Sequence, residues 1–101
     1  MELLEAFDKH SSESYTKAID YADRLPSGTS ISSVSVSAID LSNGTSAPSV
    51  VGSGSVSGTS ALVPVLGGTD GHSYLITATL TLSNANTLVG QLEMRIVDRP
   101  N

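Results

Sequence analysis

The residues of this chain best suited to chemistry are its two histidines and those of one glycine-rich stretch. The stretch runs from Gly67 to Tyr74 and places Asp70 two residues before His72. A carboxylate and an imidazole at this spacing could bind a metal ion or transfer a proton. Two ligands with no third one nearby make a poor metal site, so we favour a structural role for both side chains. The sequence therefore predicts neither a metal site nor an acid–base pair here.

The same stretch predicts a tight turn that leads into a strand. Its glycines, among them Gly68 and Gly71, allow the positive φ values that a sharp turn requires. Tyr74 follows and lies just inside a long alternating segment. This position resembles the tyrosine corner of immunoglobulin-like domains, in which the hydroxyl group bonds to upstream backbone. We therefore expect Gly68, Gly71 and Tyr74 to form a structural corner.

No arrangement of catalytic or nucleotide-binding residues stands out elsewhere. His10 and His72 are the only histidines, and a Ser–His–acid triad drawn from 18 serines lacks a G-x-S-x-G elbow. The low-complexity segment Gly52–Gly58 misses the G-x-G-x-x-G motif by one residue, and no helix is predicted after it. Asn43–Thr45 matches a glycosylation sequon but fits an ordinary hairpin turn better. We expect no enzymatic activity, no cofactor and no metal.

Composition and charge exclude several kinds of partner. The chain has 101 residues, which is the size of one small domain, and its net charge is −5 with no cysteine. Without a basic stripe, neither nucleic acid nor a membrane is an expected partner. No signal peptide and no membrane-spanning run are recognisable, so we expect the chain to be made and assembled in a cytoplasm.

The charged residues are unevenly distributed along the chain. Between Pro26 and Leu92 only Asp40 and Asp70 carry a charge, while the whole chain has 18 Ser and 9 Thr. The hydroxyl-rich surface either faces water or packs against neighbouring proteins, because hydroxyl groups cost less to desolvate than Lys or Glu side chains. Composition leaves both interpretations open.

Alternation of apolar and polar residues predicts β-strands through most of the chain. The clearest case is the pair of segments 72–83 and 88–96, which a four-residue turn joins into a hairpin. Segments 30–38 and 59–66 alternate in the same way, whereas residues 15–25 fit a helix or a strand, and we take a strand. The pattern predicts an all-β, antiparallel sandwich of six to seven strands. The expected core contains Ile19, Val34, Val36, Val63, Val65, Tyr74, Ile76, Leu80, Leu82, Leu92, Met94 and Ile96.

The ends of the chain are expected to lie outside this sandwich. Residues 1–14 are predicted to form a short N-terminal arm, in which Leu3, Leu4 and Phe7 lie at helical spacing and fit one helical turn. Such an arm is too short to be stable alone, so it docks on the sandwich, docks on another chain or stays loose. Leu3, Leu4 and Phe7 are our candidates for docking on a partner. The sandwich would then cover residues 15–98, and residues 99–101 would form a C-terminal tail.

Several segments together resemble a known family of proteins. They are, in order, Phe7–Lys9, Ile19–Tyr21, Leu25 with Gly28 and Ile31, Gly67–Ile76, and Met94–Asp98. In this order and spacing they resemble the small immunoglobulin-like structural proteins of tailed bacteriophages and prophages, which are usually encoded among the head and neck genes. The resemblance covers most of the chain and implies an immunoglobulin-like sandwich without catalytic residues.

The resemblance also implies a place in the virion. Our leading hypothesis is a capsid decoration or cement protein that binds the major capsid protein through many weak contacts, as a homo-oligomer or in many copies. One alternative is a neck, tail or fibre-attachment component that binds other virion proteins. Another is a host-surface or glycan-binding module.

Overall fold

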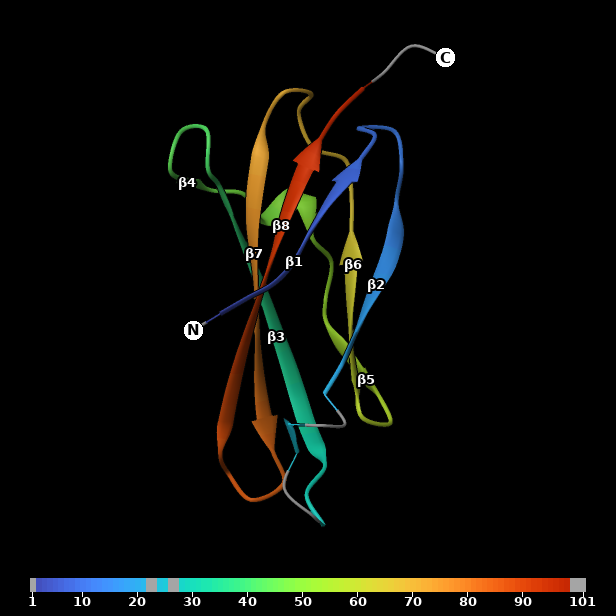
Figure 1. Ribbon diagram of the computed structural model, residues 1–101, viewed down its shortest axis with the longest axis vertical. Helices are drawn as coiled ribbons and strands as arrows, with labels where there is room; N and C mark the ends of the chain where they lie inside the picture. Colours follow the sequence, from blue (N-terminus) through green and yellow to red (C-terminus); the bar gives the residue numbers. More distant parts are fainter. Residues whose placement is uncertain (1, 22–23, 26–27, 99–101) are drawn as a thin grey trace.

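The chain folds into a sandwich of two β-sheets (Figure 1). The computed structural model describes residues 2–21, 24–25 and 28–98, with side chains from Glu5 onward. In the described residues the strands are ordered β1-β8-β7-β3-β4 in one sheet and β2-β6-β5 in the other. The predicted all-β sandwich is thereby confirmed. The elements are β1 (Glu2–Lys9), β2 (Tyr15–Asp20), β3 (Ile31–Asp40), β4 (Thr45–Ser46), the 3-10 helix η2 (Pro48–Val50), β5 (Ser55–Ser57), β6 (Ser60–Val65), β7 (Ser73–Leu82) and β8 (Thr87–Ile96).

The hairpin predicted near the C-terminal end of the chain is formed by β7 and β8. The two strands pair antiparallel from Ser73 opposite Arg95 to Thr81 opposite Thr87. β3 pairs antiparallel with the other side of β7. A shift of one residue would turn every core side chain of these strands toward water, so the apolar pattern fixes the register. The strand predicted over residues 15–25 is confirmed for residues 15–20, because β2 pairs with β6. After β2 the chain turns, and the Tyr21 carbonyl accepts hydrogen bonds from the backbone N–H groups of Arg24 and Leu25.

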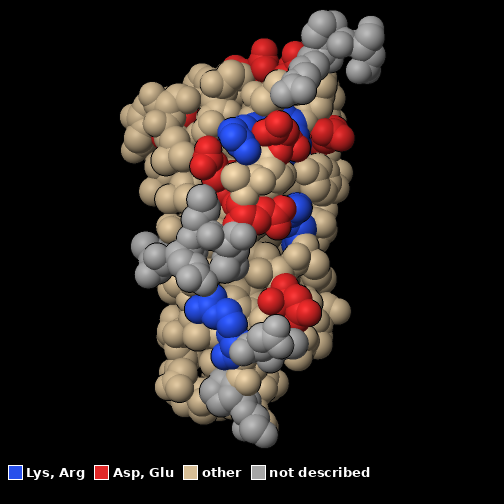
Figure 2. Space-filling view, viewed as in Figure 1, with Lys and Arg blue, Asp and Glu red and all other residues tan. Residues whose placement is uncertain are grey.

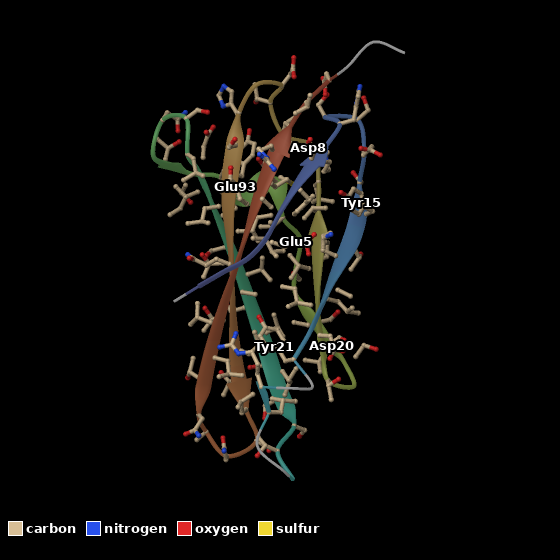
Figure 3. All side chains as sticks on the ribbon, viewed as in Figure 1. Glu5, Asp8, Tyr15, Asp20, Tyr21 and Glu93 are labelled. Carbon is tan, nitrogen blue, oxygen red and sulfur yellow. The ribbon has the colours of Figure 1, made fainter. Side chains whose placement is uncertain are left out.

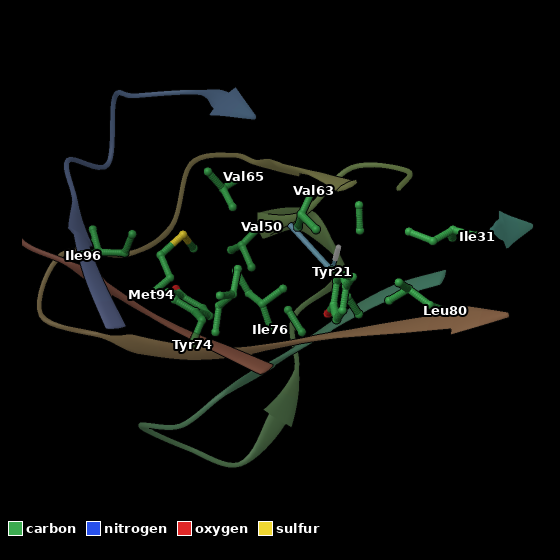
Figure 4. Close-up of a cluster of buried hydrophobic side chains, with 14 of the residues drawn as sticks. Tyr21, Ile31, Val50, Val63, Val65, Tyr74, Ile76, Leu80, Met94 and Ile96 are labelled. Atoms are coloured by element: carbon green, nitrogen blue, oxygen red, sulfur yellow. The ribbon is translucent and has the colours of Figure 1, made fainter. Parts of the chain in front are cut away.

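The core lies between the two sheets and is made mainly of the predicted side chains (Figure 4). Ile19, Val34 and Val36 are only partly buried, because β2 and this part of β3 lie at sheet edges. The expected core did not include Tyr21 or Val50, which lie outside the strands and are nevertheless buried. The buried apolar residues are Tyr21, Ile31, Ala38, Val50, Ala61, Val63, Val65, Tyr74, Ile76, Ala78, Leu80, Leu82, Leu92, Met94 and Ile96.

The prediction of a helical turn near the N-terminus was wrong. Residues 2–9 form β1, which pairs parallel with β8 and has a register shift between Leu3 and Glu5. A single helical turn is marginal in water, whereas the edge of β8 pairs with most of the segment. β1 therefore adds a parallel pair to a sandwich expected to be antiparallel with six to seven strands. The predicted tail, residues 99–101, lies outside the described residues.

Tyr21 provides a test of the core. Its side chain is 1% exposed, and its hydroxyl oxygen has no hydrogen-bond partner in the described part of the chain. Removing a buried hydroxyl without a partner relieves a desolvation cost. In Tyr21→Phe we therefore expect the free energy of unfolding, measured by urea titration, to stay the same or to rise by up to about 1 kcal/mol.

Tyr74→Phe is the matched control, because the Tyr74 hydroxyl accepts a hydrogen bond from the Thr69 backbone N–H. We expect this variant to lose about 1 kcal/mol. A comparable loss in Tyr21→Phe would show that its hydroxyl group is satisfied in solution.

Candidate functional site

The loop between β6 and β7 places the three residues expected to form a structural corner in one turn. The Tyr74 hydroxyl accepts a hydrogen bond from the backbone N–H of Thr69 over 2.9 Å. Gly68 and Gly71 have φ values of 105° and 85°, which side-chain-bearing residues rarely adopt. A Cβ atom at Gly68 would also lie 2.7 Å from the Ile96 side chain. The backbone conformation of the turn therefore requires glycine at both positions. At position 68 there is also no space for a side chain.

Asp70 and His72, whose spacing could suit a metal site or proton transfer, form hydrogen bonds with different groups. Asp70 Oδ1 accepts a hydrogen bond of 2.9 Å from the Asp98 backbone N–H. His72 Nδ1 lies 2.8 Å from Oδ2 of Asp40, a residue of β3 that the sequence pattern did not connect with it. Hydrogen bonding from His72 lowers the pKa of the Asp40 carboxyl group. Within the described ranges, no three His, Asp or Glu side chains are placed to hold a metal ion.

A second polar cluster joins the end of β1 to the end of β8 and to the loop before β7. Lys9 is 1% exposed, and its Nζ donates hydrogen bonds to the carbonyl oxygens of His10 (2.9 Å) and Gly67 (2.6 Å). Desolvation of the buried ammonium group lowers the pKa of Lys9. Asp98 accepts hydrogen bonds from the Ser11 hydroxyl and backbone N–H, and these bonds lower its pKa. Lys9 and Asp98 thus connect strand ends and loops of the chain itself.

The lowered pKa values of Asp40 and Asp98 predict a loss of stability in acid. Each carboxyl group contributes its full stabilisation above its unfolded-state value, near 3.8, and loses it as the pH falls through the lower folded-state value. We expect the free energy of unfolding, measured by urea titration, to decrease from about pH 5 to about pH 2. Asp98→Asn should show a smaller decrease, because that position no longer titrates. If the free energy of unfolding decreased equally in the wild type and in Asp98→Asn, Asp98 would not contribute to the loss of stability in acid.

The three residues proposed for docking on a partner belong to β1. The side chains of Leu3 and Leu4 lie outside the described part of the structure. Phe7 is partly buried and meets Tyr15 of β2 edge-on, with 6.5 Å between ring centroids. Lys17 Nζ lies 4.6 Å from the centroid of the same ring. Phe7 therefore joins β1 to β2, the strand on which Figure 3 labels Tyr15.

The outward surface of the five-stranded sheet carries rows of uncharged side chains. In the ladder Ser35 lies beside Thr79, and Ser37 lies beside Thr77, whose hydroxyl accepts a 3.2 Å hydrogen bond from the Gln91 amide. Such groups cost less to desolvate than charged ones. We call this surface the outer face. It consists of the ladder residues Ser33, Ser35, Ser37, Ile39, Leu75, Thr77, Thr79, Thr81, Thr87, Val89 and Gln91, together with the exposed Leu41 just after β3.

Charged residues flank the outer face along β8 and β1. Arg95 Nε lies 3.2 Å from Asp8 Oδ1, and Glu93 precedes this pair on β8. In Figure 2 acidic and basic side chains run from the top of the view into its lower half, and part of them lie where Figure 1 shows β1 and β8. The outer face is thus an uncharged area with a charged border.

An apolar patch lies at one end of the outer face. Ile39 lies beside Leu75 in the ladder, and Leu41 follows two residues after Ile39. Ile39 and Leu41 are 43% and 49% exposed. Grouped apolar side chains that remain exposed are typical of contact surfaces. This apolar patch was not predicted from the sequence, although Leu75 breaks the alternation of its segment and could have indicated it.

Comparison with known proteins identifies one related family. A family model described as podophage GP4 fiber-tail adaptor protein gp77 matches residues 9–95 of the chain. No curated protein matches the sequence. The matched range runs from the end of β1 almost to the end of β8. In the part of the chain that is described, no helix has the length and apolar character needed to cross a membrane.

Proposed function

Because this chain belongs to the family of the podophage GP4 fiber-tail adaptor protein gp77, we propose that it is an adaptor joining a fibre to the tail of a podophage. Family membership makes it a virion-associated structural protein of a tailed phage, which binds other virion proteins. The adaptor acts without enzymatic chemistry. The family match supports the fibre-attachment alternative better than the capsid decoration favoured from the sequence.

The outer face is the surface that best fits binding to another virion protein. Its hydroxyl rows can be desolvated at low cost, and the apolar patch of Ile39, Leu41 and Leu75 supplies the apolar anchor that contact surfaces need. The charged border of Glu93 and Arg95 would orient the partner at the rim. We place the contact with the fibre or tail protein on this face.

Glutamate at position 39 tests the role of the outer face. A charge within the apolar patch has to be desolvated on binding, so in virions assembled with Ile39→Glu we expect the fibre content to fall at least about ten-fold. Fibre content can be measured by quantitative mass spectrometry of purified particles. Val56→Glu is the matched control, because Val56 is 36% exposed on β5 in the other sheet. Equal fibre content in both variants would contradict the placement on the outer face.

A fractionation experiment distinguishes the adaptor from a capsid decoration protein. Heads and tails purified separately from infected cells would be probed for this chain. We expect it to remain with the tail fraction at a copy number that matches the fibres. Its recovery with heads that lack tails would overturn the adaptor proposal.

A further inference from the structure

One edge of the five-stranded sheet is open along β3. Leu41 donates its backbone N–H to the Ser73 carbonyl on β7, whereas Ala47 donates to the Ala38 carbonyl from the opposite side. Backbone groups alternate in direction along a strand, so the N–H and C=O groups of Val34 and Val36 point away from β7. On that side β4 pairs only with Ile39 and Asp40, among the residues described. The backbone N–H and C=O groups of Val34 and Val36 therefore lie along an edge of β3 that no described strand pairs with. We call this part of the edge the lane.

This lane differs from the other sheet edges in its charge. Exposed edges are normally protected against pairing by charged side chains or by being very short. β1 carries Glu5 and Asp8, β2 carries Lys17 and Asp20, and β5 has 3 residues. β3 has no charged residue before Asp40. The chain thus leaves this edge of the five-stranded sheet without a charge that would oppose pairing.

We propose that two copies of this chain pair antiparallel through their β3 edges, about a twofold axis at Ser35. In this register Val34 of each copy lies opposite Val36 of the second copy, and both residues direct their backbone groups into the lane. Ser35 then lies opposite Ser35 of the second copy. The contact is isologous, so it closes at a dimer instead of extending into a filament.

The side chains beside the lane fit a second copy. A groove of about 360 Å3 lies along this part of β3 and is lined by Val36, Ser37, Ala38, Ser46, Pro48, Val51, Gly52 and Ser53. Val34 of the second copy, opposite Val36, would point into this groove and add apolar contact with Val51. On the outward side only serines meet, so no like charges are brought together. A second copy therefore matches the edge in register, polarity and charge.

Charged residues introduced at position 35, on the twofold axis, test the pairing with the purified chain alone. We expect the wild type to form a dimer in sedimentation equilibrium at protein concentrations up to about 1 mM. Ser35→Lys and Ser35→Glu each place like charges opposite one another, and each should weaken dimerisation at least about ten-fold. An equimolar mixture of the two variants should recover the dimer, because Lys and Glu then face each other.

Thr79→Lys is the matched control, because Thr79 lies beside Ser35 on the outer face but one strand away from the edge. It should dimerise like the wild type. A monomeric wild type, an equal effect of both lysine variants, or no recovery in the mixture would overturn the proposal. These measurements involve no fibre or tail protein, so their failure would leave the adaptor function untouched.

Discussion

Replacement of Lys9 by alanine is expected to lower the free energy of unfolding by about 3 kcal/mol. The aliphatic part of Lys9 is buried, and its ammonium group donates to the carbonyl oxygens of His10 and Gly67. Alanine leaves a cavity and removes both hydrogen bonds. Urea unfolding gives the free energy, and hydrogen exchange should show faster exchange of the β1 amides, because Lys9 attaches the end of β1 to the loop before β7.

Lys9→Met separates packing from hydrogen bonding at the same site. Methionine keeps most of the buried volume and loses the charge, so we expect a loss of about 1–2 kcal/mol. If Lys9→Ala costs less than about 1 kcal/mol, the ammonium group does not hold β1 in place.

Gly68→Ala is expected to destabilise the chain by about 2–3 kcal/mol. The φ value of 105° is unfavourable for alanine, and the new Cβ atom would lie 2.7 Å from Cγ1 and Cδ1 of Ile96. Ile96 is buried at the end of β8 and has little room to move. Thermal unfolding of the variant and the wild type provides the comparison.

Gly71→Ala is the control for backbone strain without a clash. Gly71 has a φ value of 85°, and a Cβ atom there would meet nothing within 4 Å. We expect a loss of about 1 kcal/mol. Equal losses at Gly68 and Gly71 would mean that Ile96 adjusts to the extra methyl group without cost.

The sequence predicted the parts of the fold that depend on local alternation. The β7–β8 hairpin and most of the buried side chains follow from the residues of two adjacent segments, because the period of two is strong there and the turn is short. The segment of β2 was harder to interpret, since its alanines fit a helix as well as a strand. Its strand conformation depends on pairing with β6.

Features that join distant segments were not predictable in the same way. β1 is a strand because β8 offers it an edge, and nothing in residues 2–9 alone reveals that partner. The contact between His72 and Asp40 likewise depends on the pairing of β3 with β7. The apolar patch became visible once the ladder placed Ile39 beside Leu75. The proposal of an adaptor function required the family match in addition to the geometry.

The parallel pairing of β1 with β8 has a consequence for the order of folding. The two strands lie at opposite ends of the described sequence, so joining them closes a loop of nearly the whole chain. β8 offers its edge to β1 as part of a hairpin with β7, which forms from nearby residues. We therefore expect β1 to dock late, since during synthesis it emerges from the ribosome long before its partner strand. Changes within β1 should accordingly speed unfolding more than they slow folding.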